Sequence, residues 1–463
     1  MTGRSRDHRA GARAAPPATA LDRRLAWIIV AASFAVLVVL AVLLVPWSWW
    51  PAGGLRPASV GSAFTPAQVA RAESYSHAVL PLSLAATSVS LALALLLGMT
   101  RLGSGLAHAL SRGLGGAVGR RLPWWLLVPT VTFVLILLGR LVTLPFGLAI
   151  RRHDLAAGLT TQSLAGWFED WALSGLVTWL FASLVVLLVV AVARRSPRHW
   201  YVGAAVGALV GTFVLSTLYP LVVEPLFNRF QPMPDSPLKQ SLLRLAAAEG
   251  VHVDDVLVAD ASRRTTTLNA YVSGIGGTRR IVVYDNLLND LPPDQVRSVV
   301  AHELGHARNH DVVLGTGLGA VGAVLGTCLL ALLLDSQLLR RRAGVVGAGD
   351  PAVAALVLAL VAAGSLLVAP VQNAVSRSIE ARADRVALEF TRDPRAFEAM
   401  QRQLALHSLA DPTPPELVHL WFGTHPTVLQ RLGMAQAYAR QHPTAAPPAA
   451  PGGAGGGGAA RWS

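Results

Sequence analysis

The chain has 463 residues, of which 53% are hydrophobic and only 14% are charged, and its mean hydropathy is +0.48. About a quarter of the residues in a soluble globular protein are charged, so these values exclude an ordinary water-soluble enzyme and an intrinsically disordered chain. The net charge of +13 comes from arginines beside apolar stretches, which indicates membrane topology rather than nucleic-acid binding. The single cysteine, Cys328, excludes an intramolecular disulfide.

Seven apolar stretches are long enough to cross a bilayer as α-helices. Arginines precede the first, as in a signal peptide, but its apolar run is about twice the usual length and tryptophans follow it in place of a cleavage site. We therefore interpret it as a membrane span. The predicted spans are Leu25–Val45, Ala78–Gly98, Leu122–Gly139, Ala172–Ala193, Trp200–Val223, Val312–Leu334 and Ala352–Val371.

Two polar regions, Glu224–Asp311 and about Gln372–Ala439, lie between and after these spans. The Arg/Ala/Pro-rich start and the Pro/Ala/Gly-rich tail are predicted to be disordered. The predicted division is an arm at 1–20, five spans within 21–223, the first part of a polar domain at 224–311, two spans within 312–371, the second part of that domain at 372–440, and a tail at 441–463.

Short strands and helices alternate in the first polar region. Helical spacing predicts a helix over Pro237–Glu249, and Pro292 and Pro293 open another that continues through His306. Three predicted strands lie between them, at Val256–Ala259, Leu268–Val272 and Arg280–Tyr284, with a turn at Gly274, Gly276 and Gly277. The sequence therefore predicts an α-helical integral membrane protein whose polar domain carries a small β-sheet.

The second of these helices contains His302-Glu303-Leu304-Gly305-His306. Residues i and i+4 of a helix share one face, so both imidazoles can bind one metal ion. Glu303 lies between them and is close enough to polarise a water molecule bound to that ion. We interpret the motif as part of a site for one zinc ion per chain.

A catalytic zinc ion needs a third protein ligand and an open coordination position. Glu380 and Asp384 share a predicted helix face, so Glu380 can bind the metal while Asp384 accepts a hydrogen bond from a ligand histidine. An ordinary solvated face beside the neighbouring arginines is the alternative. Two predicted spans separate His306 from Glu380, and an even number of crossings returns the chain to the same membrane surface, which favours the zinc interpretation.

Zinc beside a carboxylate suits the hydrolysis of a carbonyl compound. Glu303 would take a proton from the attacking water and return it to the leaving amine. A further donor must stabilise the oxyanion, and His425, in Gly423-Thr424-His425-Pro426, is a candidate. A helix-capping or surface histidine is the alternative interpretation.

These motifs resemble the integral-membrane zinc metalloproteases of the type I CAAX prenyl protease family. The resemblance covers roughly residues 20–440, with the motifs in family order. It implies seven spans around a water-filled chamber and a mainly helical, zincin-like catalytic domain. The matching segments are PLFNRF at Pro225–Phe230, LNAYVSG and RRIVVYDNLL between Leu268 and Leu288, HELGH at His302–His306, EARAD at Glu380–Asp384 and THPTVLQRL at Thr424–Leu432.

The resemblance also implies a role for each matched residue. The zinc ligands correspond to His302, His306 and Glu380, the general base to Glu303, and the carboxylate behind a ligand histidine to Asp384.

Residues for substrate binding follow from the same resemblance. Asn269, Ala270 and Tyr271 match an edge strand along which a peptide substrate lies as an added strand, although an ordinary strand-and-turn role is the alternative. His425 and Arg431 match a His-x5-Arg pair associated with substrate and transition-state contacts, and a surface salt bridge is the alternative for Arg431.

The predicted function is that of a zinc endopeptidase of the cell membrane, acting on CAAX-type or other membrane-associated proteins and not on nucleic acid. A catalytically silent scaffold or transporter and a zinc hydrolase of a lipid are the alternatives. The intact Glu303 disfavours the first, and the candidate edge strand disfavours the second.

Two signals disagree on which membrane surface carries the zinc site. Arginines gather in the N-terminal arm and in Arg101–Arg121, Arg194–Arg198 and Arg340–Arg342, which all lie on one face. The positive-inside rule makes that face cytoplasmic and places the zinc site outside. The family resemblance implies a site that opens toward the cytoplasm.

Overall fold

A computed structural model describes residues 21–51, 54–117, 122–274 and 279–443. The predicted disorder of residues 1–20 and 444–463, and the predicted turn residues Gly276 and Gly277, lie outside the described residues.

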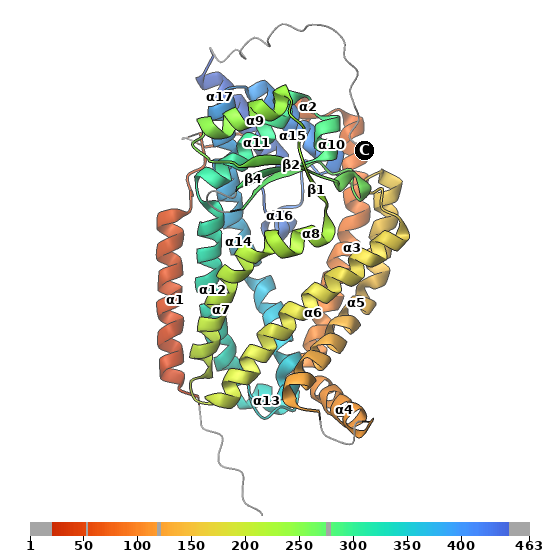
Figure 1. The fold of residues 1–463 in the computed structure, drawn as a ribbon, viewed down its shortest axis with the longest axis vertical. Coiled ribbons are helices and arrows are strands. Elements are labelled where there is room, and N and C mark those ends of the chain that lie inside the picture. The colour runs from red at the N-terminus through yellow and green to blue at the C-terminus, as the bar shows by residue number, and fades with distance from the viewer. Residues whose placement is uncertain (1–20, 52–53, 118–121, 275–278, 444–463) are drawn as a thin grey trace, which may run out of the picture.

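Seven helices among the described residues are long and apolar enough to cross a membrane, as predicted. They form an elongated bundle with a mixed domain at one end (Figure 1). Many of their large apolar side chains face outward, such as Leu43 (73% exposed) and Leu367 (76%), as contact with lipid requires. The spans are α1 (Arg23–Leu44), α3 (Pro66–Met99), α5 (Trp124–Ala157), α6 (Leu164–Arg195), α7 (Trp200–Leu218), α12 (Asp311–Leu334) and α14 (Ala354–Thr391).

Several spans continue beyond the stretches that hydropathy predicted. α3 begins at Pro66, well before the predicted start, and α5 continues to Ala157, well beyond the predicted end. The added turns carry polar side chains that bond to one another: the Tyr75 hydroxyl donates to Asp154 Oδ1 at 2.6 Å. A prediction from hydropathy leaves such turns out of the span, because it treats each polar residue as if it had no hydrogen-bond partner.

The seventh predicted span and the predicted helix of Glu380 are one continuous element. α14 runs unbroken for 38 residues, from Ala354 to Thr391. The segment that begins the second polar region is therefore the end of a transmembrane helix. Because this segment continues the seventh span, the packing of α14 in the bundle also determines where Glu380 lies.

Shorter helices connect the spans or complete the mixed domain. A π-helical turn, Tyr219–Val223, joins α7 to α8 (Glu224–Phe227). At the opposite end of the bundle from the domain lie α4 (Arg101–Ala117) and α13 (Gln337–Ala343) (Figure 1). The remaining α-helices are α2 (Val60–Ala63), α9 (Pro237–Ala248), α10 (Asp285–Asp290), α11 (Pro293–Arg308), α15 (Pro394–Ser408), α16 (Glu416–Phe422) and α17 (Val428–Gln441).

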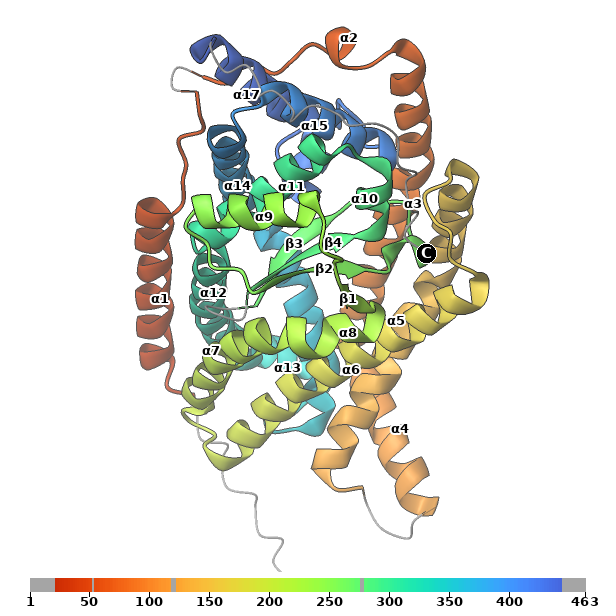
Figure 2. The same cartoon turned by 45° about the horizontal axis from the view of Figure 1, so that its top comes forward.

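The domain contains a four-stranded sheet in the order β1-β2-β4-β3 (Figure 2). β2 and β4 are parallel, and each outer strand is antiparallel to its neighbour. The three predicted strands are confirmed, with small shifts at their ends. β1 was not predicted because three residues are too few to show alternation. The strands are β1 (Phe230–Pro232), β2 (Asp255–Ala259), β3 (Ala270–Ser273) and β4 (Arg280–Tyr284).

One apolar core joins the sheet to the helices of the domain. Ile281 from β4, Leu304 from α11, Leu388 from α14 and Phe397 from α15 belong to it, and all are fully buried. Because α11 and the end of α14 contribute to the same core, the two helices with the predicted ligands are held in a fixed relation.

Candidate metal centre

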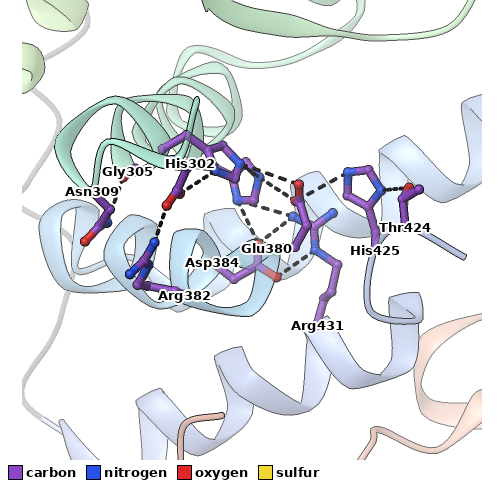
Figure 3. Close-up of polar contacts among 11 residues, drawn as sticks. His302, Gly305, Asn309, Glu380, Arg382, Asp384, Thr424, His425 and Arg431 are labelled. Atoms are coloured by element: carbon purple, nitrogen blue, oxygen red, sulfur yellow. Dashed lines mark hydrogen bonds and ion pairs between the residues drawn. The ribbon is translucent and has the colours of Figure 1, made fainter. Parts of the chain in front are cut away.

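Small residues let α11 approach α14 closely. A Cβ at Gly305 would lie 3.2 Å from Val386 Cβ and 3.4 Å from Ala383 Cα, closer than most Cβ contacts allow. Glycine at this position of the His-Glu-x-x-His motif therefore permits a contact that alanine would strain. The close crossing brings His302 opposite Glu380 (Figure 3), and His306 Nε2 lies 3.6 Å from Glu380 Oε1.

Three ligand atoms converge at this crossing. Those of His302, His306 and Glu380 all lie within 4.8 Å of one another. His302 Nε2 lies 3.1 Å from Glu380 Oε2 and 3.2 Å from His306 Nε2. Two imidazole nitrogens and one carboxylate oxygen form a donor set of the kind that binds catalytic zinc, with a fourth position left for water or substrate.

Each histidine uses its other nitrogen to contact a carboxylate. His302 Nδ1 lies 2.9 Å from Asp384 Oδ1, and His306 Nδ1 lies 2.9 Å from Asp311 Oδ2. A hydrogen on each Nδ1 leaves both Nε2 lone pairs directed at the same point, which is the tautomer that a metal requires. The donor set and its outer carboxylates therefore fit zinc.

Arginines hold both of these carboxylates. Arg431 contacts both oxygens of Asp384, with Nε donating at 2.8 Å to Oδ2 and Nη2 donating at 2.5 Å to Oδ1. Arg382 donates to Asp311. Because Asp384 is fully buried, a second charged partner reduces the cost of keeping it ionised.

The electrostatics of the ligand group favour positive charge. Burial lowers the pKa of His302, but its contacts with Asp384 and Glu380 outweigh burial and raise the pKa to about 10. A divalent cation between the ligands would satisfy the same carboxylates. Burial raises the pKa of Glu303, against the opposing effect of the two histidines, and a raised pKa makes a carboxylate a stronger base.

His425 reaches the ligand group from the loop between α16 and α17 (Figure 3). Its Nε2 lies 3.3 Å from Glu380 Oε2, and its Nδ1 lies 2.8 Å from Thr424 Oγ1. Burial lowers the pKa of His425; the carboxylate of Glu380 opposes this shift, and the charge of Arg431 adds to it. The net shift is downward and favours the neutral imidazole. His425 thus faces the predicted ligands from the side opposite α11.

The predicted substrate-binding residues lie on the sheet. Ala270 and Tyr271 belong to β3, an edge strand, and Asn269 precedes it. The Tyr271 hydroxyl donates to Glu224 Oε2 at 3.2 Å, and the Asn269 carbonyl accepts from the Tyr284 amide. The edge position agrees with the family resemblance, while the Tyr271 hydroxyl already has a partner within the chain.

Asp311 and Arg382 were not identified from the sequence. Asp311 is the first residue of α12 and reaches back to His306 because α11 ends in a tight turn, with His310 in the left-handed conformation (φ 55°). A carboxylate five residues after the second histidine was the available signal. Arg382, which is partly exposed, shows no such signal in the sequence.

A bundle of membrane spans that carries a His-Glu-x-x-His helix, with the carboxylate of Glu380 beside the two histidines, has the features of an integral-membrane metalloprotease. Residues 232–439 match the family described as Peptidase family M48, and residues 53–229 match a region described as CAAX prenyl protease N-terminal, five membrane helices. The chain belongs to peptidase family M48 and is a multi-pass membrane metalloprotease of the CAAX prenyl protease type.

Named relatives agree with this family membership. The chain is 31% identical over 306 residues to the uncharacterized metalloprotease YhfN of Bacillus subtilis, across 66% of this chain and 72% of YhfN. It is 29% identical over 285 residues to a CAAX prenyl protease 1 homolog of Dictyostelium discoideum, across 59% of each protein.

A solved structure shares the fold. The crystal structure of S. mikatae Ste24p aligns with a TM-score of 0.72 over 89% of this chain and 98% of the other, at 20% identity. The predicted fold class, a helical membrane protein with a small sheet in its catalytic domain, is confirmed.

Proposed function

We propose that this protein is a zinc-dependent endopeptidase with one zinc ion per chain, held by His302, His306 and Glu380. The observation that carries the proposal is the convergence of their ligand atoms within 4.8 Å, together with a carboxylate on the second nitrogen of each histidine. Three protein ligands with an open position are typical of catalytic rather than structural zinc.

The residues around the ligands have defined tasks in peptide hydrolysis. When bound, zinc supplies Lewis acidity toward the scissile carbonyl and the attacking water. Glu303 takes a proton from that water and delivers it to the leaving amine, a task that the raised pKa of its carboxylate favours. Asp384 holds His302 in the required tautomer, and Arg431 positions Asp384.

His425 is the proposed donor to the oxyanion. If the Thr424 hydroxyl donates to Nδ1, the proton of the neutral imidazole resides on Nε2. That nitrogen lies 3.3 Å from Glu380 Oε2, at the edge of the ligand group where the substrate carbonyl would enter. The substrate contact expected of Arg431 is a further part of this proposal.

The substrate peptide would extend the sheet at β3. The Tyr284 amide donates to the Asn269 carbonyl, and the register pairs Tyr271 with Val282. Alternation in an antiparallel pair then directs the backbone groups of Ala270 and Val272 away from β4. A peptide backbone can bond to these groups as an added strand, in a manner that does not depend on the Tyr271 hydroxyl.

The substrates proposed are CAAX-type or other membrane-associated proteins, and the proposed site of action is the cell membrane. We propose the predicted domain division as part of this arrangement: the two parts at 224–311 and 372–440, which contribute to one apolar core, would form one catalytic unit, and the spans at 21–223 and 312–371 would anchor it. Substrates held in the same bilayer would meet this unit at the membrane surface.

Cleavage of a quenched fluorescent peptide by the detergent-purified protein tests the proposal. We expect one zinc ion per chain by metal analysis, loss of zinc in His306→Ala, and inhibition by chelators. Glu303→Gln should retain zinc and fold but lose turnover by several orders of magnitude, because the amide cannot accept the proton. Unchanged zinc in His306→Ala, or wild-type turnover in Glu303→Gln, would overturn the proposal.

The same assay addresses the substrate. A prenylated CAAX peptide is compared with an unmodified apolar peptide of equal length. Faster cleavage of the prenylated peptide would support CAAX processing, and equal rates would indicate a general protease of membrane proteins.

A further inference from the structure

A cationic cavity lies at the end of the bundle opposite the catalytic domain. It is open to the surface, has a volume of about 710 Å³, and is lined by residues of α4, of α13 and of the segment that follows α13. Figure 1 shows these two helices at the end of the bundle remote from the domain. The packing that forms the cavity depends on Gly344, which ends α13 at φ 69° and lies so close to α4 that a Cβ would come within 2.7 Å of Ser104 Oγ. The cavity is therefore part of the fold and is remote from the metal centre.

The lining of the cavity carries positive charge without acidic compensation. Three arginines and a histidine contribute, and none of the described lining residues is acidic. Among the described residues no carboxylate lies within ion-pair distance of Arg101, Arg340 or Arg341. The polar and charged lining residues are Arg101, Ser104, His108, Gln337, Arg340 and Arg341.

The carboxylates of Asp335 and Asp350, which lie close to α13 in the sequence, bond to groups that do not line the charged part of the cavity. Asp335 accepts from Arg23 Nε at 2.6 Å. Asp350 accepts from the backbone amides of Val346 at 3.1 Å and Ala352 at 2.9 Å. The cavity is thus electrostatically complementary to an anion that bears several oxygen acceptors, such as a phosphate group.

The surroundings of the cavity are apolar and lie at the ends of membrane spans. α4 follows α3 directly and carries leucines at four-residue spacing, from Leu102 to Leu114, opposite a polar face with Arg101 and His108. The two middle leucines pack against the core of the bundle, and the two outer ones, Leu102 and Leu114, are exposed. Leu102 is 54% exposed, Leu338 on α13 is 58% exposed, and Val346 is 78% exposed. An amphipathic helix of this kind lies in the membrane interface, where these side chains contact acyl chains.

We propose that this cavity binds the headgroup of an anionic phospholipid from the leaflet opposite the catalytic domain. The arginines bond to the phosphate, and the exposed leucines and Val346 contact the acyl chains. The apolar rim selects a lipid over a free phosphate ion, which would gain nothing from it. Basic pockets between membrane helices on the cytoplasmic side are known to suit anionic headgroups.

Lipid occupancy measured by native mass spectrometry on the detergent-purified full chain tests this proposal. The protein is titrated with dioleoylphosphatidylglycerol, dioleoylphosphatidylcholine or inorganic phosphate. We expect preferential binding of one phosphatidylglycerol. Arg101→Gln/Arg340→Gln/Arg341→Gln should bind it about a hundred-fold more weakly, at about five-fold for each arginine lost.

A matched triple variant removes the same charge from exposed arginines at the same end that do not line the cavity. Arg112→Gln/Arg195→Gln/Arg342→Gln should weaken binding much less than the cavity triple, because these arginines do not line the cavity. The single variant Arg341→Gln, at an exposed position, serves if the cavity triple fails to fold, and should bind about five-fold more weakly. Equal binding of both lipids, equal weakening by both triples, or saturation by inorganic phosphate at the same concentration would overturn the proposal.

Discussion

Replacing a proposed zinc ligand should affect zinc binding and activity differently from replacing Asp384. Glu380 contributes an atom to the ligand group, so Glu380→Gln should greatly weaken zinc binding and abolish peptide cleavage. Asp384 only holds His302, so Asp384→Asn should retain most of the zinc and lower activity by about ten- to a hundred-fold. Metal analysis and turnover on the same preparations separate the two. Full zinc and activity in Glu380→Gln would mean that another carboxylate is the ligand.

His425 has two interpretations that a single variant distinguishes. As an oxyanion donor, it contributes only in the transition state, so His425→Ala should lower kcat about a hundred-fold with little change in Tm. As a capping residue, it would contribute to stability instead, and His425→Ala would lower Tm while turnover stayed near wild type. Steady-state kinetics and thermal unfolding on one sample decide between them.

At the residue scale, the sequence predicts those groupings of side chains that the periodicity of a single helix determines. His302 and His306, and likewise Glu380 and Asp384, share a face because they are four residues apart on one helix. The contact of Asp311 with His306 depends on the turn at His310, which no periodicity encodes. The two contacts from Arg431 to Asp384 join helices that only the tertiary packing brings together.

At the element scale, the crossing of α11 on α14 depends on the space at Gly305. Gly305→Ala would place a methyl group 3.2 Å from Val386 Cβ, so the helices must separate by a few tenths of an ångström or strain. We expect a lower Tm and weaker zinc binding, despite the better helix propensity of alanine. Gly315→Ala on α12, where the added Cβ meets nothing within 4 Å, is the control and should leave zinc binding unchanged without lowering Tm.

α9 ends at a buried acid that makes stability depend on pH. Glu249 is 1% exposed, and neither carboxylate oxygen has a hydrogen-bond partner among the described residues. Burial raises its pKa to about 8, with Arg308 opposing the shift. The folded state therefore binds the proton more tightly than the unfolded state, and stability falls as pH rises from about 4.5 to about 8.

Glu249→Gln removes this ionisation at nearly constant shape. Relative to wild type, we expect a gain of about 1–3 kcal/mol at pH 8 and little gain at pH 5, read as a difference in Tm that grows across this range. The exposed Glu416→Gln serves as control and should show no such trend. A gain of equal size at both pH values would exclude ionisation of Glu249 as the cause.

Elements were predictable from the sequence to different degrees. α9, α11 and the strands β2 and β4 follow from periodicity and flanking prolines and glycines, and the structure confirms them. The full lengths of α3, α5 and α14 could not be predicted from the sequence. Polar side chains in their outer turns find partners only within the folded protein, as Tyr75 does with Asp154.

At the scale of the whole molecule, the bundle separates two chemically different ends. The catalytic domain occupies one end, while α4 and α13 lie at the other (Figure 1). α4 and α13 carry exposed arginines, such as Arg101, Arg112, Arg341 and Arg342. The ion pair between Arg23 and Asp335 and the bond from Arg194 to the Gly349 carbonyl hold these segments together. The number of spans and the alternation of polar regions were enough to predict this separation.

The unequal distribution of arginines between the two ends of the bundle predicts its orientation in the membrane. The arginine-rich end includes Arg101, Arg194, Arg195 and Arg340–Arg342, whereas the short connection at 158–163, at the catalytic end, contains no arginine. Short basic segments are retained on the cytoplasmic side. We therefore expect the arginine-rich end to face the cytoplasm and the catalytic domain to face outward, although the family resemblance implies the reverse.

Cysteine labelling on intact cells measures this orientation. Cys328 is buried and is replaced by alanine to give a background without reactive thiols. Single cysteines are then placed at Arg440, an exposed residue of α17 in the catalytic domain, or at Arg341 on α13. A membrane-impermeant maleimide should label Arg440→Cys on intact cells and Arg341→Cys only after permeabilisation. The opposite pattern would place the zinc site on the cytoplasmic side and would mean that the local arginine bias does not determine the topology of this chain.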